Sequence, residues 1–436
     1  MPDPADLDSF RRDVRSWLDA NAPAAARGVL TSIEGQGNWG GRRPTFDPPE
    51  MKTWLERAVS RGWTAPTWPR EYGGGGLSAE QAKVLEQELA AAKLPPPLMG
   101  FGLEMIGPTL LQFGNEEQKR EHLTKIARGE IRWCQGYSEP DSGSDLASLS
   151  TRAVRDGDHF IVNGRKVWTS YGDLADWIFA LVRTDPSAKK QEGITFLLID
   201  MATPGVSVRP IRLISGKSPF CETIFDDVRV PVKNVVGQIN AGWTVAKALL
   251  GYERAMIADA FGASERGKRP QVARSEPKAS EGHQKGARSE AKPSEDRKGG
   301  ESQGSRLVQL ARQYGFGGDG PLADGVLRDE IAQLEMDERA FHLTVQRSRD
   351  AAKAGHRPGP ESSLFKVYAT ELNKDRHELM VRIAGAQGLG WEGAGYDDDE
   401  IALTRQWLRS RGNSIEGGTS EVQLNIIAKR VLGLPD

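Results

Sequence analysis

The spacing of apolar side chains changes twice along this chain of 436 residues. From residue 6 to about residue 128, apolar positions recur every three or four residues, which is the period of a helix that buries one face. Between residues 131 and 237 the period falls to two, as in a strand, and from residue 241 the helical period returns. A chain of this length exceeds what one hydrophobic core usually serves. We therefore expect an α+β multidomain protein, mainly α, in which helical, strand-rich and helical units follow one another.

The helices can be placed by their periodicity and by the breaks between them. Pro- and Gly-rich stretches at 72–77 and 94–97 cannot continue a helix, so they separate the helices of the first unit. The helices expected there are 10–18, 51–61, 78–93 and 116–127. Those expected after the strands, which indicate a bundle, are 241–261, 322–354, 362–384, 398–409 and 421–432.

The strand-rich part contains a strong local turn signal. Asn163-Gly164 separates the short runs 160–162 and 165–168, and both residues tolerate positive φ, so a hairpin is expected here. Further strands are expected at 177–183, 194–200, 206–213 and 222–225. Their regular spacing indicates a small antiparallel barrel or sandwich.

Residues 264–306 interrupt the second helical region. They consist mainly of Ser, Glu, Lys, Arg, Gly and Pro, lack aromatic residues, and have Val272 as their only branched aliphatic residue. Such a segment cannot bury enough apolar area to offset the entropy of ordering it. We therefore expect a disordered insert.

Composition narrows the classes of partner. The 58 Lys and Arg residues nearly cancel the 60 Asp and Glu residues, so no global field attracts nucleic acid. Cys134 and Cys221 are the only cysteines and have no metal-ligand spacing, so neither a disulfide framework nor a metal site is expected. The polar N-terminus and the lack of any apolar run of about 18 residues predict a cytoplasmic protein without membrane insertion.

Residues 135–145 hold the densest group of small and polar side chains, at the change from helix to strand. Small residues let a backbone approach a ligand closely, and hydroxyl and N–H groups supply hydrogen-bond donors. Such donors suit an electron-rich cofactor such as a reduced flavin. An ordinary Asx or Ser turn would also explain the stretch.

A second polar stretch, residues 415–423, opens the last expected helix. Ser420 and Gln423 have the spacing of a capping box, and Gly417 and Gly418 precede them. A helix N-terminus behind two glycines can admit an anionic or electron-rich group. A simply capped helix is the alternative.

Glu253 stands out within the expected helix 241–261. The apolar positions Ala246, Leu249 and Met256 advance in steps of three and four, which place residue 253 on the same stripe. Burial disfavours the charged form of a carboxylate and makes it a stronger base. Either a catalytic base or a structural ion pair would account for this position.

Five motifs occur in one order along nearly the whole chain. They are GWTAPTWPREYGGGGLS (62–78), FGNEEQK (113–119), YSEPDSGSD (137–145), NGRKVWTS (163–170) and GGTSEVQLNIIAKRVLG (417–433). Together they resemble the FAD-dependent acyl-CoA dehydrogenases. The resemblance implies a helical N-terminal domain (1–130), a β-barrel middle domain (131–238) and a C-terminal helical bundle (239–436) that carries the insert.

The resemblance also assigns roles to individual residues. It implies that Ser144 and Arg254 bind the substrate, and Ser144 matches a position close to the CoA phosphates. Cofactor binding falls to Gln135, Tyr137, Ser138, Gly143, Ser144, Trp168, Ser170, Gln387, Thr419 and Glu421.

The family places its catalytic base in one of two positions. One precedes the Gly-Thr of the C-terminal motif; here that position is Gly417, with Glu416 one step out of register. The other is a Glu immediately before Arg on the helix that matches 241–261, which Glu253-Arg254 fits. Glu253 is the expected base and Glu416 the alternative.

The implied reaction is α,β-dehydrogenation of an acyl-CoA thioester to the trans-2-enoyl-CoA, with electrons passed to an electron-transfer flavoprotein. A homodimer, homotetramer or heterotetramer with a related subunit is expected. Two departures from the family pattern bear on this. The element that reaches a neighbouring subunit's FAD would fall near 279–284, inside the insert, and the Gln-x-x-Gly-Gly stretch survives only at 387–391. A non-catalytic or half-active partner subunit of a heteromeric complex is therefore a second hypothesis, and an acyl-CoA oxidase that uses oxygen is a third.

Overall fold

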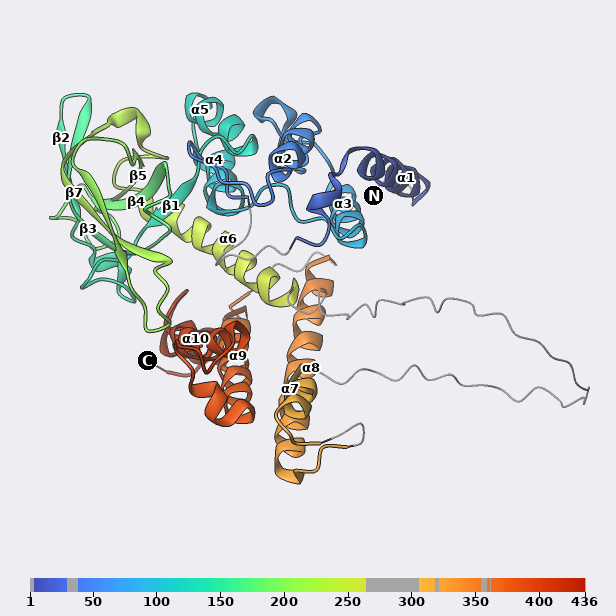
Figure 1. Cartoon of the computed structure of the whole chain (residues 1–436). Coiled ribbons are helices and arrows are strands. Elements are labelled where there is room, and N and C mark those ends of the chain that lie inside the picture. The colour runs from blue at the N-terminus through green and yellow to red at the C-terminus, as the bar shows by residue number, and fades with distance from the viewer. Residues whose placement is uncertain are drawn as a thin grey trace, which may run out of the picture. The chain divides into compact units, whose positions relative to one another are not determined.

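The computed structural model describes residues 4–29, 38–263, 306–317, 321–353, 359–360 and 362–435, with the side chains of 4–5, 254–263, 349 and 352–353 excepted. It divides into two compact units (Figure 1). The first comprises Met1–Ile257 together with Glu416–Val422, and the second comprises Ala258–Ile415 together with Gln423–Asp436. Within the described residues, no helix combines the length and the apolarity needed to cross a bilayer.

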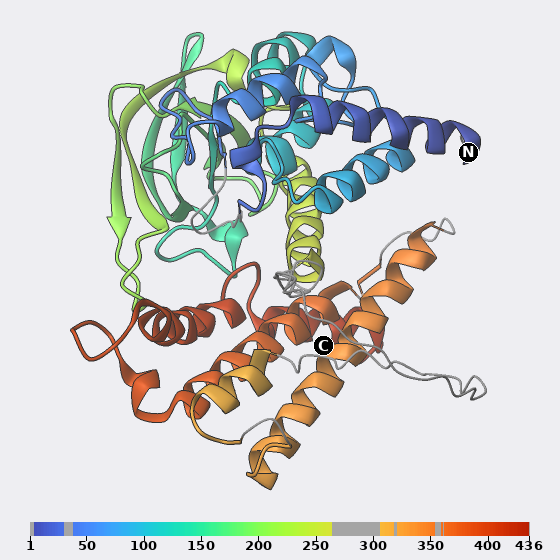
Figure 2. The same cartoon turned by 45° about the vertical axis from the view of Figure 1, so that its right-hand side comes forward.

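The first unit begins with helices. Their bounds are α1 Pro4–Asn21, η1 Ala24–Ala26, α2 Met51–Ser60, η2 Arg70–Tyr72, α3 Ala79–Ala91, η3 Gly102–Ile106, α4 Gly107–Phe113 and α5 Glu116–Ala127. Reciprocal capping boxes start α3 at Ser78 and Gln81, and α5 at Asn115 and Gln118. These caps explain why both helices begin where the sequence predicts. Helix α1 lies along α3 (Figure 2), and Trp54 is fully buried in the core between these helices.

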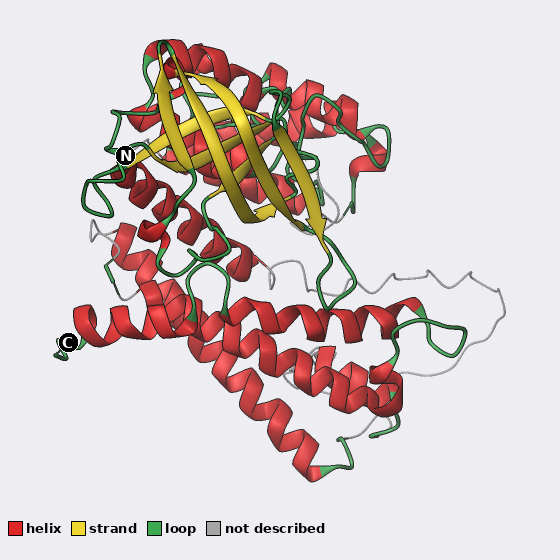
Figure 3. Cartoon of the chain, turned by 90° about the vertical axis from the view of Figure 1, so that its left-hand side faces the viewer, coloured by secondary structure: helices red, strands yellow, loops and turns green. Residues whose placement is uncertain are grey.

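Seven strands form one curled sheet (Figure 3). They are β1 Trp133–Gly136, β2 Arg152–Asp156, β3 His159–Ser170, β4 Trp177–Arg183, β5 Ile194–Asp200, β6 Val206–Ile211 and β7 Phe220–Pro231. Their order is β1-β4-β2-β3-β7-β6, with β5 also paired to β4. The predicted sheet is present, but its pairing is mixed, because β4 runs parallel to both β1 and β2.

The hairpin predicted at Asn163-Gly164 is wrong. Both residues lie inside the single strand β3, which pairs with β2 on one side and with β7 on the other. A register shift between Val162 and Gly164 marks a bulge, and a Cβ at Gly164 would lie 2.5 Å from Thr151 Oγ1. The glycine therefore serves close packing. The turn lies between β2 and β3, at Gly157 with φ 61°.

Apolar side chains cover both faces of the sheet. One face, which includes Phe179 and Phe196, shares a core with α4, α5 and the start of α6 Gly242–Ala263. The opposite face has its own core around Val162 and Ile178. The sheet thus fixes β1 and α6 against a common packed layer.

The second unit is helical, as predicted. It contains α7 Arg306–Gln313, α8 Gly325–Lys353, α9 Ser362–Ala384, η6 Gly385–Leu389, α10 Asp398–Ser410 and η7 Arg411–Ser414. Helix α9 packs against α7, α8 and α10 around a core that includes Leu379 and Ile383. The last helix, α11 Ser420–Ile426, continues as η8 Ile427–Val431. Of the predicted insert, residues 264–305 lie outside the described residues, and Arg306 already belongs to α7.

Candidate active site

The polar stretch after β1 lies beside the second half of β3. The backbone N–H of Val167 donates to the carbonyl oxygen of Ser138 at 2.9 Å. The Lys166 Nζ donates to the carbonyl oxygen of Tyr137 at 3.1 Å. The structure therefore brings together two of the motifs that the sequence singles out, YSEPDSGSD and NGRKVWTS.

A buried ion pair holds these two motifs in place. Lys166 Nζ lies 2.7 Å from Glu139 Oε1, and the two side chains are 0% and 4% exposed. The Glu139 carboxylate also accepts hydrogen bonds from the Ser150 N–H at 2.6 Å and from the Thr151 N–H at 2.9 Å. Burial alone raises the pKa of Glu139, but the charge of Lys166 and these hydrogen bonds lower it to about 2. Burial lowers the pKa of Lys166 to about 8 against the opposing effect of Glu139, so the pair is ionised at neutral pH.

Neither member of this pair is assigned a role by the sequence motifs. A signal was present, because the alternation that starts at Phe160 and Val162 places position 166 on the same inward face of β3. A lysine at an inward strand position needs a buried partner.

The tip of the first motif is open. Ser142 is buried and donates its hydroxyl to the carbonyl oxygen of Asp145 at 2.8 Å. Gly143 and Ser144 beyond it are exposed. A Cβ built on Gly143 would meet no atom within 4 Å, so packing within the described protein does not require glycine there.

Trp168 stands out on β3. Its indole is 54% exposed, unusual for so large an apolar side chain, and meets Phe220 edge-on at 6.1 Å between ring centroids. Its φ of 61° is rare for a bulky residue, and the β3–β7 register shifts at this point. The bulge turns the Trp168 ring outward while Thr169 stays buried, and Ser170 pairs with Phe220.

Glu253 lies on the α6 stripe that begins with the buried residues Val245, Ala246 and Leu249. Its side chain is half-buried rather than fully buried. The amide Nε2 of Gln135, on β1, donates to Glu253 Oε2 at 3.2 Å. The structure thus joins the expected base to Gln135, in the polar stretch 135–145. The Arg254 side chain lies outside the described ones.

Tyr137 is also close to Glu253. Its ring is 5% exposed and meets Phe179 and Phe196 edge-on. Its buried hydroxyl has no hydrogen-bond partner among the described residues. Burial, and then the negative charge of Glu253, raise the pKa of Tyr137 well above its ordinary value. A neutral phenol that can donate a hydrogen bond therefore lies near the carboxylate.

The C-terminal motif differs from prediction in its cap. Helix α11 begins at Ser420, and the hydroxyl of Thr419 accepts from the Val422 N–H at 3.2 Å. The N-cap of α11 is thus Thr419. The predicted capping box, with Ser420 as the N-cap and Gln423 as its partner, was placed one residue too late. Gly417 and Gly418 have φ of 64° and 90°, a backbone region that favours glycine.

The other predicted residues of this motif fall on both sides of these glycines. Glu416 and Thr419 are half-buried and Glu421 is exposed. All three belong to the first unit, which also contains β1 and Glu253. Gln387 lies on η6 in the second unit and is half-buried there.

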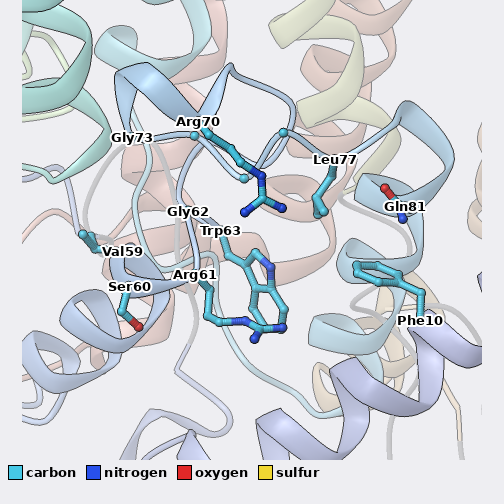
Figure 4. Close-up of a pocket in the computed structure, with 13 residues that line it drawn as sticks. Phe10, Val59, Ser60, Arg61, Gly62, Trp63, Arg70, Gly73, Leu77 and Gln81 are labelled. Carbon is cyan, nitrogen blue, oxygen red and sulfur yellow. The ribbon is translucent and has the colours of Figure 1, made fainter.

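A separate hollow of about 590 Å³ lies among the N-terminal helices (Figure 4). Its lining includes the Trp63 ring and the side chains of Arg61 and Arg70. None of the predicted site residues lines it. Cys134 and Cys221 are buried free thiols, and no cluster of metal-ligating side chains occurs within the described residues.

Comparison with known proteins agrees with this architecture. Family models described as the N-terminal, middle and C-terminal domains of acyl-CoA dehydrogenase match residues 34–130, 134–228 and 304–432. The acyl-CoA dehydrogenase IpdE1 of Mycobacterium tuberculosis is 34% identical over 99% of this chain and 98% of its own length. A solved structure of the Tcur3481-Tcur3483 steroid ACAD has a TM-score of 0.70 and 29% identity over 99% of this chain and 98% of its own. The ChsE4-ChsE5 complex from Mycobacterium tuberculosis has a TM-score of 0.66 and 27% identity over 100% and 98%.

Proposed function

Because the chain belongs to the acyl-CoA dehydrogenase family, we propose that it uses FAD to convert an acyl-CoA thioester to the trans-2-enoyl-CoA and passes the electrons to an electron-transfer flavoprotein. The observation that carries the proposal is the Gln135–Glu253 hydrogen bond of 3.2 Å. It joins a carboxylate, the group needed to take a proton from carbon, to Gln135, a residue that we assign to the cofactor.

Three residues of the predicted cofactor set have features that suit a flat, polar cofactor. Tyr137 offers a buried hydroxyl without a partner among the described residues, Trp168 presents an exposed indole, and the space over Gly143 is open. We assign FAD binding to these residues and to Gln135, Ser138, Ser144, Ser170, Gln387, Thr419 and Glu421. Bound FAD supplies the acceptor for the hydride that leaves Cβ.

In the proposed reaction Glu253 removes the α-proton of the thioester. The α-carbon of a free thioester is a very weak acid, so the negative charge that develops must be stabilised by fixed donors away from water. The half-buried position of Glu253 on α6 shields part of the carboxylate from water. Ser144 and Arg254 are assigned to the CoA moiety. Glu416 is the alternative base.

We propose that the acyl group is bulky and derived from a steroid. Support comes from the solved structure of a steroid ACAD, which matches nearly the whole of this chain at 29% identity. Tcur3481-Tcur3483 and ChsE4-ChsE5 each carry the names of two different chains. These names favour a heteromer over a homomer as the assembly of this chain. In that case this chain would be one subunit of a heteromer and would need its partner for a complete FAD site.

The test is the visible spectrum of the purified protein, alone and mixed with candidate partner chains. We expect a bound flavin that is bleached without oxygen by a steroid-derived acyl-CoA more than by straight-chain thioesters, and reoxidised faster by an electron-transfer flavoprotein than by oxygen. A protein that stays colourless after reconstitution with FAD, with and without partners, would refute the enzymatic proposal. Rapid reoxidation by oxygen would instead identify an oxidase.

A further inference from the structure

The Gln135 amide projects from strand β1, whose position is fixed by its pairing and by its neighbours. Strand β1 pairs with β4, with Gln135 opposite Phe179. Its neighbour Cys134 is fully buried, and a Cβ added at Gly136 would lie 2.6 Å from Ile178 Cδ1. The strand therefore has little freedom to move. A side chain that projects from it has a defined origin, as required to hold a reacting group in place.

Glu253 is held by a second, independent element. Helix α6 is anchored in the core shared with the sheet through Val245, Ala246 and Leu249. One residue before the base, the Tyr252 hydroxyl donates to Gln112 Oε1 of α4 at 3.0 Å. The Gln135–Glu253 hydrogen bond thus spans two fixed elements that are 118 residues apart in the sequence.

From this geometry we infer that Gln135 is a positioning residue for the base: its amide orients the Glu253 carboxylate and sets the pH at which that carboxylate accepts a proton. The inference rests on the proposed function. The amide Nε2 is a donor, so it stabilises the ionised carboxylate more than the neutral acid. Partial burial acts in the opposite direction. Gln135 therefore favours the ionised carboxylate against the effect of this partial burial.

Charged and titratable groups on the elements that carry or adjoin Gln135 and Glu253 can be separated from this effect. Tyr137, from the loop after β1, stays neutral because its pKa is well above its ordinary value. Gln112, on α4, carries no charge. Glu104 lies on η3, which packs against β1, and Arg254 follows the base on α6. A substitution at position 135 leaves all of these groups unchanged, so a shift in the titration of Glu253 reports on the amide.

The test is Gln135→Leu, which keeps the approximate size of the side chain and removes the donor. We expect the acidic limb of the pH profile for single-turnover flavin reduction to move up by about one pH unit, since a hydrogen bond to a charged group has that strength. At pH values below this acidic limb, the rate of the variant should be about tenfold lower than that of the wild type. At pH values above the limb, the two rates should be equal. Gln112→Leu is the matched control, because it removes an amide that contacts α6 next to the base, and its limb should stay in place.

A readout that needs no flavin uses the apoprotein. The carboxyl band of Glu253 is titrated by infrared spectroscopy, assigned by its loss in Glu253→Gln, and should move in the same direction in Gln135→Leu. A uniform loss of rate at every pH, with an unmoved infrared titration, would overturn the inference and leave Gln135 a structural or cofactor residue. If Glu253→Gln itself keeps full single-turnover activity, the proposed base is wrong. That result is distinct from an unmoved acidic limb in Gln135→Leu, which would contradict only the positioning role of Gln135.

Discussion

At the scale of single residues, some buried polar groups of the candidate site have all their hydrogen-bond partners within the protein, and others have none among the described residues. Glu139 is enclosed by donors from Lys166, Ser150 and Thr151. Tyr137, two residues earlier, has a buried hydroxyl with no hydrogen-bond partner among the described residues. A buried polar atom left without a partner costs free energy, so it requires an explanation, such as a bound ligand or a role in catalysis. The contrast supports Glu139 as part of the scaffold and Tyr137 as part of the proposed site.

The two candidate bases can be separated by matched substitutions. Glu253→Gln keeps the shape of the side chain but removes its basicity, so substrate should still bind while flavin reduction slows by roughly 10² to 10⁴ fold. Glu416→Gln should change the rate far less. Position 416 precedes two glycines with left-handed φ, and the position that matches the family's base is Gly417 itself.

Stopped-flow absorbance with a substrate that bleaches the flavin measures both rates. Should reduction survive in Glu253→Gln and collapse in Glu416→Gln, the base would lie in the C-terminal motif, with its register shifted by one residue.

At the scale of elements, strands with continuous apolar sequence were predictable. The runs at 177–183 and 194–200 match β4 and β5 to the residue. Asn163-Gly164 gave a wrong prediction because a local turn signal takes no account of long-range pairing. Strand β3 pairs with β2 on one edge and with β7 on the other. The true turn has its own signal in Gly157-Asp158, the two residues between the paired Asp156 and His159.

Two helical regions longer than a single turn, the η3–α4 region and α7, went unpredicted for different reasons. Gly102, Gly107 and Pro108 suggest a broken helix, but the chain remains helical by widening into the π-helix η3 before α4. Helix α7 is only 8 residues long, too short for its period to be recognised beside the insert. The Gln135–Glu253 contact could not be foreseen from spacing, because it depends on how β1 and α6 pack.

The buried Lys166–Glu139 pair predicts a large effect on stability. Lys166→Met leaves the Glu139 charge buried without its cation, so the free energy of unfolding should fall by about 3–5 kcal/mol. Lys190→Met, which removes the exposed partner of Asp145, is the control and should change it little. Urea denaturation measures both. Equal, small losses in the two variants would show that the buried pair does not join the two motifs as described.

The same pair fixes the sign of a pH dependence. Because the folded pKa of Glu139 is about 2, below its ordinary value of 4.5, the stability it contributes is complete above pH 4.5 and lost as the pH falls toward 2. Lys166→Met should therefore lose its disadvantage relative to the wild type over this acidic range.

At the scale of the whole molecule, the order of helical, sheet and helical parts follows from the two changes of apolar period. The return of residues 416–422 to the first unit does not follow from periodicity. That return depends on contacts across more than a hundred residues, which leave no local pattern. The family motifs supplied it indirectly, by assigning Thr419 and the 137–145 stretch to one cofactor.

The insert provides the last prediction. Residues 264–305 lie outside the described residues, and their composition predicts that they contribute few core contacts. Replacing them with a Gly/Ser linker of equal length preserves the span between α6 and α7 while removing the native sequence. Thermal unfolding should then shift by no more than a few degrees, and flavin content should be retained. Leu307→Ala, in the 5%-exposed core position of α7 next to the insert, is the control and should cost about 2–5 kcal/mol. A linker variant that loses as much stability as Leu307→Ala would show that the native insert packs against the protein.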